Sequence, residues 1–115
     1  MTRTVCSKST GEVLFSVKLD PGVNAGLNLV NMRDARLRGA DLRQALMLDA
    51  DLNGADLSFA DLRAAQLAGA DLRKTNLRGA RLKGVYLLDA IYDRNTIWPE
   101  GFNPARHGAV FVPTY

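Results

Sequence analysis

Apolar residues return every five positions through the central part of the chain. On a helix, five residues advance about 500°, so these side chains would point to all sides. On a flat strand the side-chain period is two, so an odd spacing would send successive side chains to opposite faces. The spacing therefore predicts a backbone that turns a corner once in every five residues. The predicted core residues are Leu37, Leu42, Met47, Leu52, Leu57, Leu62, Leu67, Leu72, Leu77, Leu82 and Leu87.

If each corner is about 90°, four such units close a square coil, and coils stack at the strand spacing of roughly 4.8 Å. The apolar centres run from Leu27 to Tyr92, with a small residue two positions before each. This predicts an all-β solenoid of about three and a half coils. The alternative, an Ala/Leu-rich helical array, needs spacings of three and four, and these are absent.

The corners fall two residues after each centre, where glycine and aspartate are frequent. Both tolerate the left-handed conformations that tight turns use. The same position is also occupied by Gln44, Phe59, Ala64 and Lys74. We therefore expect that a positive φ is not required at every corner.

The two ends read as caps for the solenoid, because an open end exposes unpaired backbone. Residues 1–24 predict a β-hairpin, with Phe15 on its apolar side. Residues 25–94 form the predicted solenoid, and residues 95–115 a cap and tail within the same structural domain. Trp98 and Phe102 are expected to plug the last coil, although Trp98 could instead serve as a binding aromatic. The tail AVFVPTY has strand character and either pairs with an edge or stays loose.

Units such as ADLRQ, ADLNG, ADLSF, ADLRA and ADLRK resemble the pentapeptide-repeat family over about Ala25 to Arg94. This resemblance implies a right-handed quadrilateral β-helix, with each centre and the residue two before it pointing inward. It does not imply one activity. The best-understood members mimic DNA and protect DNA gyrase, and many others have no assigned role.

The chemistry of the sequence gives little support to catalysis. A single cysteine, Cys6, and a single histidine, His107, cannot supply an intrachain disulfide or a Cys/His zinc site. No phosphate-binding glycine motif is present. We expect a protein that is not an enzyme, with no cofactor, no metal and no small-molecule substrate. The N-terminus lacks the apolar core of a signal peptide and no stretch could span a bilayer, so the expected location is cytoplasmic, without membrane contact.

Arranging the register in four outward faces separates one apolar face from three charged ones. Ser58 is expected to point outward on the first face. The second carries Arg43, Arg63 and Lys83, which we call the basic ladder. The third, which we call the apolar face, carries Leu46, Leu48, Ala68, Tyr86 and Leu88, with Leu29 at a nearby corner.

The preferred interpretation is a non-catalytic scaffold that binds a protein partner, or forms a homodimer, through the apolar face. An alternative is that the hairpin or the tail covers this face. A second function is DNA mimicry towards gyrase, but a net charge of +3 disagrees with an acidic rod. A third is binding of an anionic partner such as nucleic acid along the basic ladder. The interleaving of Asp with Arg makes nucleic acid an unlikely partner.

Overall fold

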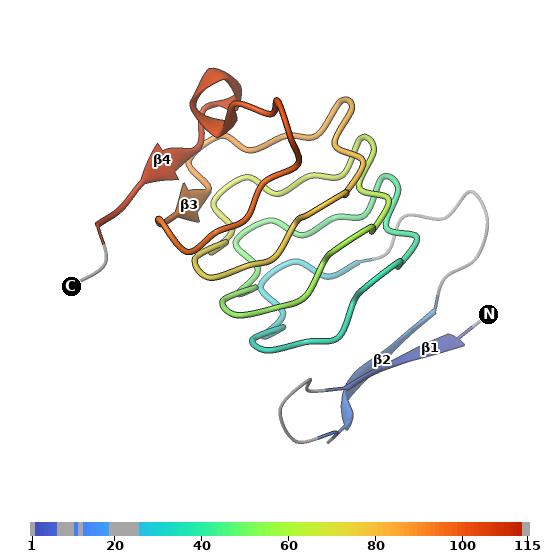
Figure 1. Ribbon diagram of the computed structural model, residues 1–115. Coiled ribbons are helices and arrows are strands. Elements are labelled where there is room, and N and C mark those ends of the chain that lie inside the picture. Colours follow the sequence, from blue (N-terminus) through green and yellow to red (C-terminus); the bar gives the residue numbers. More distant parts are fainter. Residues whose placement is uncertain (1, 7–10, 12, 19–25, 114–115) are drawn as a thin grey trace.

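The computed structural model describes residues 2–6, 11, 13–18 and 26–113, the first and third of these segments by their backbone only. Strands β1 (Thr2–Cys6) and β2 (Val13–Lys18) pair antiparallel, with Thr2 opposite Lys18. The other elements are β3 (Ile91–Tyr92), the 3₁₀ helix η1 (Pro104–His107) and β4 (Val110–Phe111). From residue 26 to β3 the chain winds into stacked square coils (Figure 1).

The coils repeat every 20 residues. Parallel bridges join each outward position to the one 20 residues further on, from Gly26 with Leu46 to Asp71 with Ile91. Backbone hydrogen bonds run along the axis of the stack: the Leu62 N–H donates to the Arg81 carbonyl at 2.9 Å, and the Arg81 N–H donates to the Ala60 carbonyl at 2.9 Å. The predicted 20-residue register is therefore present in the backbone.

The interior of the coils is filled by the predicted residues. Every predicted core side chain from Leu37 to Leu87 is buried, and Leu82, close to the C-terminal end, is the most exposed of them at 7%. The alanines two positions before the centres are buried as well from Ala35 to Ala90, which leaves room for one large side chain per unit. Thr75 takes one of these small positions, and its hydroxyl donates to the Leu52 carbonyl at 2.8 Å.

The expectation about the corners was wrong. Every corner from residue 29 to residue 89 has a positive φ, including Gln44 (60°), Phe59 (59°), Ala64 (59°) and Lys74 (59°). Each corner is closed by a bond from the next small residue to the preceding centre, as in Ala45 N–H to Leu42 carbonyl at 3.1 Å. A positive φ at the third residue is the signature of a type II turn. The closure of the coil imposes this conformation on any side chain.

The register changes by one residue at the exit from the solenoid. Tyr92, predicted as a centre, is only partly buried, whereas Asp93, which the five-residue period places at an outward position after that centre, is 2% exposed. The next turn is closed by Thr96 N–H to Asp93 carbonyl at 3.1 Å, and Ile97 bridges to Asn76, 21 residues earlier. These two predictions were therefore wrong.

Buried hydrogen bonds account for the change. The Asp93 carboxylate accepts the N–H groups of Lys74 (3.1 Å) and Asn95 (3.0 Å). The Thr96 hydroxyl donates to the Leu72 carbonyl at 2.7 Å. Asp93 thus takes the inward position because its carboxylate is satisfied there, which a tyrosine ring could not provide.

Aromatic residues close the C-terminal end. The Trp98 ring stacks on Phe102 with centroids 5.3 Å apart and meets the edge of Tyr92 at 5.5 Å, and all three pack partly buried against the core. Strand β4 pairs parallel with β3, so the tail does pair with an edge. At the other end Phe15 lies in β2, but its side chain, like residues 7–10 and 19–25 of the predicted cap, is outside the described part.

Candidate interaction surfaces

The apolar face consists of two adjacent columns. Leu46, Gln66 and Tyr86 are bridged in succession in one column, and Leu48, Ala68 and Leu88 occupy the other. Tyr86 is 63% exposed and Leu88 61%, and Leu29 at its corner is 76% exposed. Leu46, Leu48 and Ala68 are half-buried. The face is therefore most exposed at its C-terminal end and at the Leu29 corner.

The described part of the tail does not run across this face. The Asp89 N–H donates to the Gly108 carbonyl at 2.9 Å, and the Val110 N–H donates to the Ala90 carbonyl at 2.7 Å. These bonds stack the tail on the end of the coil instead. Gly108 comes close to Leu88, since a Cβ at Gly108 would lie 3.1 Å from Cδ1 of Leu88.

The basic ladder is largely neutralised by carboxylates on its own face. Arg43 binds Asp41 through two bonds of 2.9 and 2.8 Å, and Arg63 binds Asp61 through two bonds of 2.9 and 2.7 Å. These hydrogen bonds lower the pKa of Asp41 and of Asp61 below 3.8. Lys83 has no carboxylate two residues before it, because Arg81 occupies the position that Asp61 holds one coil earlier. The three cations are therefore not a free ladder.

Ser58 occupies an outward position, as predicted, but it is buried there. Its side chain is 1% exposed, and its hydroxyl donates to Oδ1 of Asp56 at 2.5 Å. Nη1 of Arg38 lies 3.4 Å from the same hydroxyl, and the Arg38 guanidinium lies 4.7 Å from the centre of the Phe59 ring. These neighbouring side chains cover a position that the five-residue period places outward.

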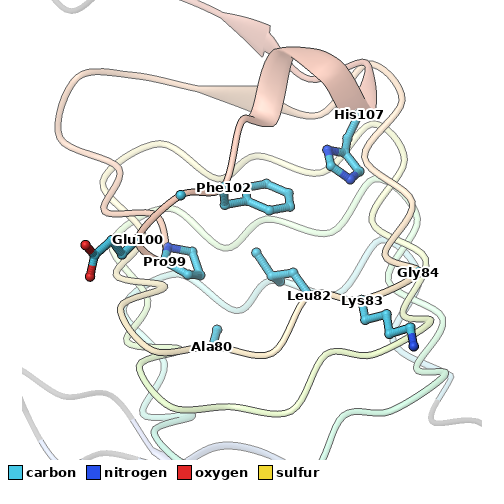
Figure 2. Close-up of a pocket in the computed structure, with 9 residues that line it drawn as sticks. Ala80, Leu82, Lys83, Gly84, Pro99, Glu100, Phe102 and His107 are labelled. Carbon is cyan, nitrogen blue, oxygen red and sulfur yellow. The ribbon is translucent and has the colours of Figure 1, made fainter.

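A hollow that the sequence did not predict lies at the C-terminal end of the stack. Its volume is about 440 Å³. Leu82 and Phe102 face each other across it, with Pro99 beside them, while Glu100 and Lys83 point away on opposite sides (Figure 2). The hollow depends on the path of the cap, which the five-residue period does not encode. Its lining residues are Ala80, Leu82, Lys83, Gly84, Pro99, Glu100, Gly101, Phe102 and His107.

His107 sits at the rim of the hollow. Its ring stacks on Phe102 with centroids 4.6 Å apart, and its Nδ1 lies 3.1 Å from the Asn103 carbonyl oxygen. Within the described ranges there is no group of three or more His, Cys, Asp or Glu residues that could hold a metal ion. The same ranges contain no helix long and apolar enough to cross a membrane.

The repeats identify the family of the chain. The family model described as pentapeptide repeats (8 copies) matches residues 30–65 and 60–91, which together span more than half of the chain. The chain belongs to the pentapeptide-repeat family, whose members form right-handed quadrilateral β-helices and are generally non-enzymatic structural repeat proteins.

Solved pentapeptide-repeat proteins are similar to this chain. One from Nostoc PCC 7120 is 38% identical over 78% of this chain and 83% of its own length, with a TM-score of 0.46. One from Cyanothece 51142 is 28% identical over 59% and 60%, with a TM-score of 0.44. One from the thylakoid lumen of Arabidopsis thaliana is 33% identical over 60% and 59%, with a TM-score of 0.22. No curated protein sequence matches the chain.

Proposed function

We propose that the protein is a non-catalytic scaffold that associates with a second copy of itself through the apolar face. The observation that supports this most directly is the exposure of Tyr86 (63%) and Leu88 (61%) next to each other on one face. Contiguous apolar side chains of this kind are uncommon on a monomer and are typical of interaction sites.

The composition of the whole face points the same way. Its outward residues are uncharged throughout: Gly26, Asn28, Leu46, Leu48, Gln66, Ala68, Tyr86 and Leu88. Apart from Ile91, the other three faces carry Asp, Arg, Lys, Asn or Ser at the equivalent positions, so the fold itself does not require apolar residues there. Two flat, adjacent columns of side chains suit a two-fold symmetric dimer, in which the same patch on each copy contacts the other.

The two alternatives have less support. DNA mimicry towards gyrase requires an acidic surface, whereas the chain carries a net charge of +3. Binding of an anionic partner along the basic ladder requires free cations, but Arg43 and Arg63 are held by Asp41 and Asp61. The cytoplasmic location stays a prediction.

The test replaces Tyr86 and Leu88 by arginine in one variant and measures molar mass by light scattering, together with thermal stability. We expect a dimeric wild type and a monomeric variant with nearly unchanged stability, because both side chains are exposed. The matched control is Asn31→Arg with Asn95→Arg, which adds the same charge at exposed positions outside the apolar face and is expected to stay dimeric.

Three outcomes would count against the proposal. A wild type that is monomeric over the accessible concentration range would exclude self-association, and a dimeric double variant would place the contact elsewhere. A variant that loses stability without a change in mass would indicate that the chain covers its own face.

A further inference from the structure

We call one side of one coil a rung. The rung at residues 80–84 has no strand stacked on it. In the coil below, the Leu62 and Ala64 N–H groups donate to the carbonyls of Arg81 and Lys83, and the Ala60 carbonyl accepts the Arg81 N–H, all at 2.9 Å. The equivalent groups one coil later are the N–H groups of Leu82 and Gly84 and the carbonyl of Ala80. Within residues 26–113 none of these three groups has a hydrogen-bond partner.

The path of the cap leaves this rung open. Ile97 stacks on the neighbouring face, where its carbonyl accepts the Leu77 N–H at 2.7 Å. Strand β4 stacks on β3 at the opposite side of the coil. Between them the chain from Trp98 to His107 passes above the rung without pairing to it (Figure 2). Among the described residues, the solenoid is therefore continued at residues 76–77 and at β3, joined to the tail on the side of residues 85–89 by the Asp89–Gly108 bond, and interrupted on the side of residues 80–84.

The hollow lies directly over the open rung, since Ala80, Leu82 and Gly84 are among its lining residues. Its volume of about 440 Å³ lies within the usual range for ligand sites, roughly 300–1,000 Å³. Leu82 and Phe102 provide apolar walls (Figure 2). Unpaired strand edges of this kind are templates for an added strand.

Two unpaired cations flank the rung. Arg81 and Lys83 are exposed, and neither makes an ion pair with any residue that the structure describes. One coil earlier the same two columns hold Asp61 and Arg63, which neutralise each other. Glu100, the one acidic residue lining the hollow, points away from it (Figure 2). A strand added here would place its outward side chains above two positive charges.

We propose that the rung at residues 80–84 binds an extended segment of a partner protein in which one apolar residue is flanked by acidic residues. In parallel register, the acidic residue before the apolar one donates its N–H to the Ala80 carbonyl and accepts the Leu82 N–H. The residue after the apolar one accepts the Gly84 N–H. The apolar side chain lies over Leu82 and against Phe102, and the two acidic side chains lie above Arg81 and Lys83.

The direct test uses a fluorescein-labelled peptide with blocked ends, Ser-Ala-Asp-Leu-Glu-Gly-Ser, and measures binding by fluorescence anisotropy. The register gives a matched pair of controls. Methylating the amide nitrogen of the peptide's aspartate removes the donor to Ala80 and is expected to weaken binding at least tenfold. Methylating the nitrogen of its leucine, which points away from the rung, is expected to leave binding within about twofold. A peptide with lysine in both acidic positions should not bind.

The protein side is tested with Arg81→Glu combined with Lys83→Glu, which should weaken binding of the acidic peptide at least tenfold. The control is Lys74→Glu combined with Arg94→Glu, which changes the net charge equally at exposed positions away from the hollow. Amide hydrogen exchange gives an independent measurement. The Leu82 and Gly84 amides should exchange faster than those of Leu62 and Ala64 and become protected when the peptide binds.

Several outcomes would overturn the proposal. These are no binding at millimolar peptide, equal loss of binding for the two N-methylated peptides, and protected Leu82 and Gly84 amides in the free protein. Equal competition by a thymidine oligonucleotide would show that the cations attract any anion without strand addition. None of these outcomes depends on the mass of the protein in solution, so this proposal and the proposed dimer fail separately.

Discussion

The ring of Phe59 lies over the corner at Gly79, one coil further along. A Cβ at Gly79 would come within 2.5 Å of both Cδ1 and Cε1 of that ring. Gly79 also has a φ of +69°, a conformation that favours glycine. The corner therefore favours glycine for two separate reasons, its backbone conformation and the ring packed against it.

We predict that Gly79→Ala destabilises the protein more than Gly39→Ala. The two glycines share nearly the same φ, +69° and +70°, so both variants incur a left-handed cost of about 1–2 kcal/mol. A Cβ at Gly39 meets nothing within 4 Å, whereas one at Gly79 displaces Phe59. Urea unfolding should show a free energy of unfolding for Gly79→Ala lower than that for Gly39→Ala by about 1 kcal/mol or more.

A double variant isolates the contribution of the ring. In a Phe59→Ala background, Gly79→Ala should cost no more than Gly39→Ala does in the wild type, because the obstructing ring is gone. An unchanged cost in that background would show that Phe59 is not what makes this corner sensitive.

At a left-handed corner that is not occupied by glycine, replacement by glycine is expected to stabilise the protein. At Gln44, with a φ of 60°, replacement by glycine removes a backbone cost of about 1–2 kcal/mol and adds about 0.4–1 kcal/mol of unfolded-chain entropy. We expect Gln44→Gly to raise the free energy of unfolding by about 0.5 kcal/mol. The neighbouring Ala45→Gly should lower it by about 1 kcal/mol, since Ala45 is fully buried and not at a corner. Chemical denaturation measures both variants. If Gln44→Gly and Ala45→Gly lowered the free energy of unfolding by similar amounts, this prediction would be contradicted.

The sequence predicted the parts of the fold that follow from strict periodicity. Leu57 and Leu77 are buried because their spacing places them on the inside, and the Asp41–Arg43 neighbourhood follows from the same register. The position of Asp93 could not be predicted in this way, because Tyr92 fits the apolar period and only the three-dimensional arrangement of N–H donors favours the carboxylate.

Local packing explains the other differences. Ser58 occupies an outward position in the register, yet Asp56 and Arg38 cover it. The open rung at residues 80–84 depends on where the cap crosses the coil. Such features arise from contacts between segments distant in the sequence, and the period of a single segment carries no signal for them.

An adjacent pair of residues tests the register directly. Leu77 is fully buried, so Leu77→Asp places an unpaired charge in the core and should prevent folding. Arg78 is exposed, and its side chain has no partner among the described residues, so Arg78→Asp should change stability by only about 0.5 kcal/mol. Circular dichroism with thermal unfolding distinguishes the two. Similar stability for both variants would mean that the inward and outward positions are assigned wrongly.

The last prediction concerns the response of the fold to acid. Burial raises the pKa of Asp71, but hydrogen bonds from the Arg73 side chain (3.0 and 2.7 Å) and its N–H (3.0 Å) outweigh burial and leave the pKa below 3.8. A carboxyl group with a lowered folded pKa stabilises the fold above its unfolded pKa, and this contribution is lost as the pH falls through the folded pKa. We expect Asp71→Asn to be less stable than the wild type at neutral pH. The difference should shrink as the pH is lowered from about 5 towards 2, and urea unfolding over that range measures it. A difference that stays constant with pH would show that the Asp71–Arg73 pair does not stabilise the fold through its charge.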